Sequence, residues 1–564
     1  MLGCTDTGEP RAGNSWDTFR DQFLEEYFVS NPAFAVNQGR HEFDGRLPDW
    51  SAEGIKAEID RLKSQRERAL ELDAAQLDSQ QQFERDYLLS VIDSNLFWLE
   101  TAEMPFNNPA FYLYSYIYGN SLDPSTYVSR QYAPLEVRLR AYTEYARAVP
   151  EAAVQIRNNL RTPLAPTLVD IGQLGFGGLA SYLEDDVPAV FADVKDEELQ
   201  SRFQQSNQSA IQALRDLEAW FTEQEADATG DYALGRERFS QMLSRTEMVD
   251  IPLEQLEEIG RQDLERNLEA LKEACSRLAP GKSIQDCLEM VKGDKPEDGP
   301  VEAARGQLLD LKQFVLDKGL VSIPGAEEAL VEESPPYMRW NLAYIDIPGP
   351  YEENLPAIYY ISPPDPSWSP QEQRDYLPGR ADLLFTSVHE VWPGHFLQFL
   401  HSNRSLSKFG QAFVGYSFAE GWAHYAEELM WEAGLGEDSQ GEDSPTVHIG
   451  QLSNALLRNA RFLSAIGLHS GTMTVEESEL MFREKTFQDA GTARQQAARG
   501  TFDPAYLNYT MGKLMIRKLR EDWTSTRGGR EAWDDFHDRF LSFGGPPIPL
   551  VRRAMLPDDP GTLF

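Results

Sequence analysis

The sequence predicts a mainly α-helical protein with one small antiparallel β element, and three observations support this fold class. Apolar residues recur at helical spacing, most clearly from Leu253 to Leu271. Two capping boxes, at Ser369–Glu372 and Thr474–Glu477, mark the starts of helices. The helix that begins at the second box should end by Gly491. Strand signals, in contrast, are few.

Length and composition indicate one large helical body preceded by a short tether. The 564 residues are 41% hydrophobic and 11% aromatic, which is enough to bury an extensive core. No repeat, low-complexity block or Ser/Gly-rich linker marks an internal boundary. We therefore expect residues 1–13 to form a tether and residues 14–564 to form a single helical catalytic domain.

The chain is strongly acidic, with 52 basic and 91 acidic residues and a net charge of −39. This charge argues against nucleic acid or an anionic membrane surface as a partner. Two explanations remain open, a dispersed acidic surface and a preference for cationic substrates.

The first residues resemble the end of a bacterial lipoprotein signal. Leu2-Gly3-Cys4 precedes a polar stretch, which predicts a lipid on Cys4 and a periplasmic, membrane-anchored protein. A chance occurrence of these three residues is the alternative. No run of 18 or more apolar residues occurs, so no transmembrane segment is expected.

The two remaining cysteines lie on either side of a turn signal, Pro280-Gly281. Cys275 and Cys287 could therefore form a disulfide across a helical hairpin, which suits an oxidising periplasm. Two buried free thiols are the alternative.

Two aromatic and β-branched segments, Trp340–Ile347 and Ala357–Ser362, are separated by Pro348-Gly349-Pro350. They predict a short antiparallel strand pair just before the segment that carries the site. The pair could bind an extended substrate along its edge or serve as a structural hairpin, and the sequence leaves both open.

The strongest functional signal is a histidine and glutamate cluster. His389, Glu390 and His395 are followed by Glu420 on a second predicted helix, and six of the eight histidines lie between His389 and His469. Two imidazoles and one carboxylate are a ligand set of catalytic zinc, with a fourth position left open. Glu390 would then be the general base that accepts a proton from the attacking water.

The spacing of the two histidines requires an irregular helix. At i and i+6 on a regular helix, His389 and His395 would lie about 120° apart. Pro393 and Gly394 lie between them and favour a distorted turn that could bring the two imidazoles together. From residue types alone, a purely structural role for the cluster remains open.

These residues also resemble a known family. The matching segments are His389-Glu390-x-x-Pro393-Gly394-His395-x-x-Gln398, Phe418-x-Glu420-Gly421-Trp422-Ala423-x-Tyr425-x-Glu427, Pro335–Arg339, Tyr359–Pro366, Tyr509-x-x-Gly512 and Phe536-His537-Asp538. Together they resemble the DUF885 family of bacterial proteins, which is similar to gluzincin metallopeptidases. The resemblance implies a helical gluzincin-like fold, a Zn²⁺ ion held by His389, His395 and Glu420, and a peptide substrate.

By similarity to gluzincins, a late tyrosine and histidine would stabilise the oxyanion of the transition state. Tyr509 is the first candidate and His469 the second, although a tyrosine in an aromatic core often serves only packing.

Other polar residues have supporting roles in this hypothesis. His424 and Glu427 or Glu428 share a helical face with Glu420 and could orient a ligand, as Gln398 could orient His395. A solvated acidic face is the alternative for Glu428. The candidates for substrate carboxylate recognition or, alternatively, structural ion pairs are Arg339, Arg458 and Arg461.

The sequence thus predicts a zinc metallopeptidase. Two alternatives remain: a zinc hydrolase of non-peptide amides or esters, and a catalytically silent envelope binding protein. The intact Glu390 argues against the second alternative, because a binding protein needs no general base.

Overall fold

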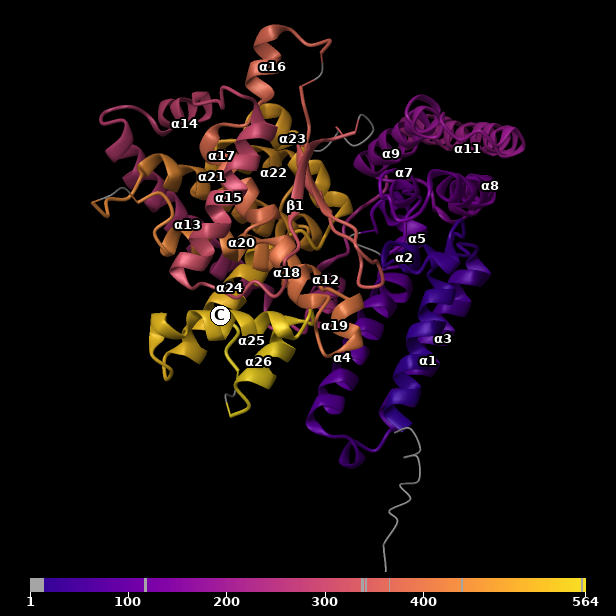
Figure 1. The fold of residues 1–564 in the computed structure, drawn as a ribbon, viewed down its shortest axis with the longest axis horizontal. Helices are drawn as coiled ribbons and strands as arrows, with labels where there is room; N and C mark the ends of the chain where they lie inside the picture. Colours follow the sequence, from indigo (N-terminus) through magenta and orange to yellow (C-terminus); the bar gives the residue numbers. More distant parts are fainter. Residues whose placement is uncertain are drawn as a thin grey trace, which may run out of the picture.

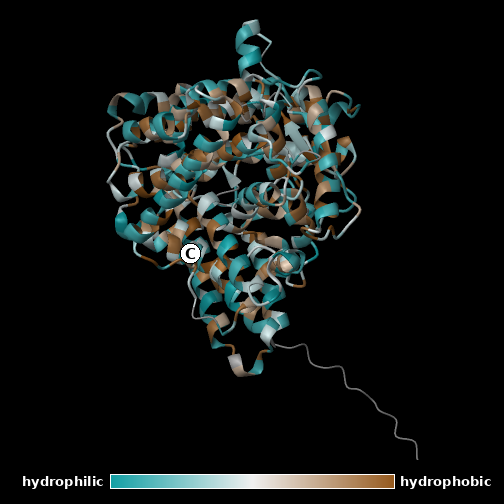
Figure 2. Cartoon of the chain, turned by 90° about the vertical axis from the view of Figure 1, so that its left-hand side faces the viewer, coloured by the Kyte–Doolittle hydropathy of each residue, from teal (hydrophilic) through white to brown (hydrophobic). Residues whose placement is uncertain are grey.

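Helices dominate the structure because long segments carry one apolar face. In α13 (Leu253–Leu278), the predicted stripe is confirmed, since Leu253, Leu256, Leu264 and Leu271 are buried. Both capping boxes are also formed, at Ser369 and Thr474. Hydrophilic and hydrophobic residues alternate along individual helices in Figure 2, as amphipathic packing requires.

The computed structural model describes residues 15–115, 119–335, 339, 342–364, 366–437, 440–558 and 561–564. The predicted tether, including Cys4, lies outside the described residues, as do Trp340 and most of the segment Pro335–Arg339. Within the part of the chain that is described, no helix is long and apolar enough to cross a membrane.

The first group of helices lies on the right of Figure 1, where α8, α9 and α11 pack together and α3 packs on α4. Its elements are α1 (Ser15–Ser30), α2 (Pro32–Asn37), η1 (His41–Phe43), α3 (Ala52–Glu71), η2 (Ala74–Gln76), α4 (Ser79–Leu96), η3 (Phe97–Thr101), α5 (Met104–Asn107), η4 (Pro109–Tyr112), α7 (Ser125–Val128), α8 (Leu135–Asn159), α9 (Pro166–Asp185), α10 (Val187–Val190), α11 (Glu197–Gln224) and η5 (Glu225–Asp227).

The second group contains the histidine cluster, and its main helix pairs are α13 with α21 and α20 with α24. Besides α13, its helices are α12 (Arg236–Thr246), α14 (Ile284–Gly293), α15 (Pro300–Lys318), α16 (Pro370–Tyr376), α17 (Arg380–Glu390), α18 (His395–Ser402), α19 (Lys408–Ala412), α20 (Tyr416–Glu432), α21 (Pro445–Ser470), α22 (Val475–Lys485), α23 (Ala490–Phe502), α24 (Asn508–Thr524), η7 (Gly529–Ala532), α25 (Trp533–Ser542) and α26 (Ile548–Met555). The helix predicted to end by Gly491 is α22, which ends earlier, at Lys485.

A small mixed sheet lies between the two groups (Figure 1), in the order β1-β3-β2. The predicted antiparallel pair is confirmed as β2 (Ala343–Asp346) and β3 (Ala357–Ile361). A third strand, β1 (Ala329–Glu333), pairs in parallel with β3 and was not predicted. The small element predicted as antiparallel is therefore a mixed sheet, because a parallel partner can come from a segment with no hairpin signal.

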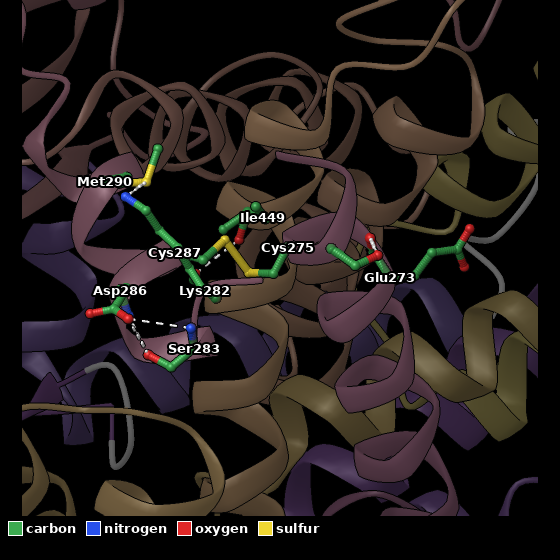
Figure 3. Close-up of a disulfide and its surroundings, with 10 residues drawn as sticks. Glu273, Cys275, Lys282, Ser283, Asp286, Cys287, Met290 and Ile449 are labelled. Carbon is green, nitrogen blue, oxygen red and sulfur yellow. Dashed lines mark hydrogen bonds between the residues drawn. A yellow bond between two sulfur atoms is a disulfide. The ribbon is translucent and has the colours of Figure 1, made fainter. Parts of the chain in front are cut away.

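The predicted disulfide is present between Cys275 of α13 and Cys287 of α14 (Figure 3). It closes a helical hairpin whose connecting residues include the Pro280-Gly281 turn.

Both groups of helices share one cluster of buried hydrophobic residues, which extends from Trp16 to Met555. In the lower part of Figure 1, α4 of the first group packs on α12, α19 and α26. A cavity of about 3080 Å³ is lined by residues of both groups. The cavity receives one face of α9, the edge strand β2, and residues of α17, α20, α21 and α23.

Candidate metal centre

The helix that carries His389 is interrupted, as its sequence predicts. α17 ends at Glu390 and α18 begins at His395, so the four residues between them form an irregular turn. Gly394 is required there, because a Cβ atom at this position would lie 1.8 Å from the carbonyl oxygen of His389. The close approach turns the start of α18 back over the end of α17, and the two imidazole rings meet at 4.8 Å.

The second motif segment fixes this turn and supplies the third side chain. Trp422 of α20 donates a hydrogen bond from Nε1 to the carbonyl oxygen of Pro393 at 2.8 Å. Next to it, Gly421 meets Gly512 of α24, where a Cβ atom on Gly421 would lie 2.5 Å from the Cα of Gly512. This helix crossing brings Glu420 of α20 close to Tyr509 of α24.

Three side chains converge at the end of α17. Oε2 of Glu420 lies 3.3 Å from Nε2 of His389 and 3.3 Å from Nε2 of His395. Two ligand atoms on a tetrahedral zinc ion, each bonded at 2.0 to 2.1 Å, lie about 3.3 Å apart. The same Oε2 is buried and, among the residues that the structure describes, has no hydrogen-bond partner. The donor set and its spacing therefore fit a divalent metal of the zinc type.

No other such group occurs among the residues that the structure describes. His389, His395 and Glu420 offer ligand atoms that all lie within 4.8 Å of one another. Glu390 lines the cavity beside these three residues, and its carboxyl interacts electrostatically with each of them. Burial raises the pKa of Glu390.

His389 is oriented from its other side by Glu427. Nδ1 of His389 lies 2.7 Å from Oε1 of Glu427, while Arg458 of α21 reaches the same Nδ1 at 3.1 Å. Because a ring nitrogen cannot donate and accept together, the shorter carboxylate contact indicates a protonated Nδ1. Its Nε2 is then the free lone pair that faces Glu420.

Charge around Glu427 is balanced at close range. Arg458 lies 3.1 Å from Oε1 of Glu427, and Nδ1 of His424 lies 3.5 Å from Oε2. Although burial alone would raise the pKa of the Glu427 carboxyl, Arg458, His389 and His424 hold it well below its usual range. Burial lowers the pKa of His424 to about 4, so this imidazole is neutral.

Tyr509 lies at the site, as predicted. Its hydroxyl donates a hydrogen bond to Oε1 of Glu420 at 3.0 Å, and burial together with Glu420 raises its pKa. The guanidinium groups of Arg458, Arg461 and Arg499 lie 5.5, 5.0 and 5.9 Å from its ring.

His469 is not brought to the site, so the structure does not support its predicted role. Its Nε2 lies 2.7 Å from the carbonyl oxygen of Gly500, and its Nδ1 accepts a hydrogen bond from the backbone N–H of Leu234. His469 is eleven residues beyond Arg458 on α21, a rise of about 16 Å along the helix. Both ring nitrogens are used in packing the end of α21.

Two supporting predictions are also corrected. Gln398 does not orient His395, because its side chain donates to Oγ of Ser402 at 2.7 Å and to the carbonyl oxygen of Gly544. Glu428 is neither a ligand partner nor solvated. It is buried and pairs with Arg266 at 2.7 Å and with Lys513 at 3.3 Å.

The remaining candidate, Arg339, lines the cavity and donates from Nε to the carbonyl oxygen of Ser334 at 3.0 Å. The contact of Arg458 with His389 was not predicted. Its only sequence signal is a position on α21, whose packing against α17 cannot be read from periodicity.

A family comparison decides the relationship suggested by these motifs. The family model described as "Bacterial protein of unknown function (DUF885)" matches residues 32–555. The chain belongs to the DUF885 family. No curated protein matches the sequence.

Two solved structures share the fold of this DUF885 protein. One is a "putative lipoprotein of unknown function" from Shewanella oneidensis, with 22% identity, a TM-score of 0.78, and coverage of 96% of this chain and 100% of the other. The second is described as "the putative lipoprotein from Colwellia psychrerythraea". It has 16% identity, a TM-score of 0.81, and coverage of 96% of this chain and 98% of the other. At these identities the likeness shows the fold alone.

Proposed function

We propose that this DUF885 protein is a zinc-dependent hydrolase, and specifically a gluzincin-like metallopeptidase. The observation that carries the proposal is the convergence of His389, His395 and Glu420. Both histidine–carboxylate distances are 3.3 Å, which is the separation of two ligand atoms on a tetrahedral zinc ion. When bound, zinc supplies a Lewis acid that polarises a carbonyl group and promotes ionisation of a water molecule.

Glu390 has the position of a general base. It follows the ligand His389 directly and lines the cavity, and it is not needed to hold the metal. Its carboxylate takes the proton of the attacking water and delivers it to the leaving amine. Burial raises its pKa, which makes the carboxylate a stronger base than an exposed glutamate.

Tyr509 and Glu427 position the ligands around this base. The Tyr509 hydroxyl holds Oε1 of Glu420, so that Oε2 faces the two histidines. To stabilise an oxyanion in the transition state, the Tyr509 hydroxyl would redirect its single proton from Oε1 of Glu420 to that oxyanion. Glu427 fixes the tautomer of His389 from behind.

The edge strand β2 favours a peptide over a small ester as the substrate. Residues 342–346 line the cavity, and β2 is an outer strand of the sheet. Such a strand presents backbone N–H and C=O groups to which an extended peptide can add as a further strand.

We further propose that the protein is a periplasmic lipoprotein anchored through Cys4. Leu2-Gly3-Cys4 in the sequence, the Cys275–Cys287 disulfide and the description of both structural neighbours support this location. Labelling with a lipid precursor, compared between the parent and Cys4→Ser, tests the anchor.

Metal analysis tests the central proposal. Protein purified without chelators should contain about one zinc per chain, and the double variant His389→Ala/His395→Ala should lose most of it. His448→Ala is the matched control, because this half-buried histidine stacks on Trp431 at 4.0 Å and lies outside the site. If the double variant retains as much zinc as His448→Ala, His389 and His395 are not the zinc ligands.

A further inference from the structure

The wall of the cavity beside Tyr509 is cationic, although the chain as a whole carries a net charge of −39. Arg458, Arg461 and Arg499 all lie within 6 Å of the Tyr509 ring centre. Three buried or partly buried cations in one place need anionic partners, because an unpaired charge out of water is costly.

Two of the three arginines have such partners within the protein. Arg458 lies 3.1 Å from Glu427. Arg499 lies 2.8 Å from Asp503, which is fully buried. Their charges are therefore compensated before any ligand arrives.

Arg461 is different, because its one polar partner is neutral. It is only 8% exposed, and its Nε donates to Oε1 of Gln496 at 2.7 Å. Among the described residues, neither of its Nη groups has a hydrogen-bond or ion-pair partner. Both Arg461 and Gln496 line the cavity.

This arrangement leaves the end of the guanidinium available. Gln496 fixes the group through Nε, and the Tyr509 ring supports it at 5.0 Å. The two Nη groups then form the fork that binds a carboxylate through two parallel hydrogen bonds. A bound carboxylate would compensate the charge that the protein itself leaves unpaired.

Arg461 is also close to the metal ligands. Tyr509 bonds Glu420 at 3.0 Å through its hydroxyl and contacts Arg461 at 5.0 Å through its ring. One tyrosine ring thus separates them, and an extended peptide of about three residues or fewer spans that separation.

We propose that Arg461 binds the C-terminal carboxylate of peptide substrates, so that the site releases one to three residues from the C-terminal end. This inference rests on the proposed metallopeptidase function and adds its substrate class. Arg461 acts as a specificity residue, and Gln496 is its positioning residue.

The test compares tetra-alanine with its C-terminal amide. Binding of both peptides is measured by calorimetry to zinc-loaded Glu390→Gln protein, and kcat/KM is measured with the parent. The free acid should be favoured by about 10- to 100-fold, as expected for a charge-assisted pair. Arg461→Gln should abolish this preference, and Arg461→Lys should retain only part of it. Arg494→Gln, an exposed arginine on the same cavity wall, should keep the preference.

The outcomes separate this inference from the proposed function. Cleavage of acid and amide at equal rates overturns the inference and leaves the peptidase intact. Acid-selective binding lost in Arg461→Gln, without cleavage by the parent, supports the subsite and contradicts the peptidase. A third peptide, the amide of Ala-Glu-Ala-Ala, tests a side-chain source, and binding as tight as the free acid overturns the terminal assignment. If Arg461→Gln fails to fold, the acid-to-amide ratio of the parent still decides.

Discussion

At the scale of single residues, the tautomer of His389 is set by Glu427, which contacts its Nδ1. Oε1 of Glu427 accepts a hydrogen bond from the protonated Nδ1 of His389 at 2.7 Å, which directs the Nε2 lone pair toward Glu420. Arg458 keeps Glu427 ionised, so the orienting bond is charge-assisted. Glu390 is proposed neither as a ligand nor as a residue that orients one. Loss of its carboxylate should therefore slow the reaction without releasing the metal.

Glu390→Gln separates an enzyme from a binding protein. Glutamine keeps the size and shape of the side chain but cannot accept a proton at neutral pH, so peptide cleavage should fall by about 10² to 10⁴. Zinc content and thermal stability should stay close to those of the parent. Unchanged kcat in the zinc-loaded variant would show that this carboxylate is not the base.

The convergence of the proposed ligand residues could be predicted, because their residue types and spacing indicate a metal site. His389, Glu390, His395 and Glu420 form a pattern that few other functions need. His469 belonged to the same histidine-rich region, but its position eleven residues beyond Arg458 on α21 removes it from the site. Whether Arg461 is paired could not be predicted, because Gln496 meets it only through tertiary packing.

At the scale of elements, the site depends on two places where backbone meets backbone. Gly394 allows the turn between α17 and α18, and Gly421 with Gly512 allows α20 to cross α24. The first could be predicted from Pro393-Gly394 inside a helical pattern. The second could not, because close helix approach depends on two glycines ninety-one positions apart.

Gly394→Ala should damage the metal site through the backbone. Its Cβ would lie 1.8 Å from the His389 carbonyl oxygen and 2.4 Å from that of Val388, so the turn must open and separate the imidazoles. We expect zinc affinity to fall at least about tenfold and the thermal midpoint to decrease.

Gly306→Ala is the control for this prediction. It lies inside α15 with open space around its Cβ, where alanine should be neutral or stabilise by about 0.5 to 1 kcal/mol. Equal zinc affinity in Gly394→Ala and the parent would contradict this account of the turn.

At the scale of the whole molecule, polar contacts join the first group of helices to the sheet that lines the cavity. Arg130 of the first group donates to Asp346 of β2 at 2.7 Å, and a second hydrogen bond, to the carbonyl oxygen of Asn37 in the same group at 2.8 Å, holds it in place. His41 of η1 adds a second link, 3.2 Å from Glu352 in the loop between β2 and β3. The strand pair could be predicted from the sequence, but the links of Arg130 to Asp346 and of His41 to Glu352 could not, because the partners are more than two hundred residues apart.

The His41 link should make the stability of the molecule depend on pH. Burial would lower the pKa of His41, but hydrogen bonds to Asp44 and Glu352 raise it to about 9. Because the folded pKa exceeds the unfolded value of about 6.5, the stabilisation is fully present below pH 6.5 and is lost as pH rises through about 9. The difference in free energy of unfolding between the parent and His41→Gln should therefore narrow by on the order of 2 kcal/mol between pH 6 and pH 10.

Urea unfolding of both proteins at each pH measures this gap in the free energy of unfolding, and other titrating groups cancel in the difference. His448→Gln serves as control, because burial lowers the pKa of His448 to about 4. Since this folded pKa lies below the unfolded value of about 6.5, the gap for His448→Gln should not narrow as pH rises from 6 to 10. A gap for His41→Gln that stays constant between pH 6 and pH 10 would show that His41 is not charged in the folded protein.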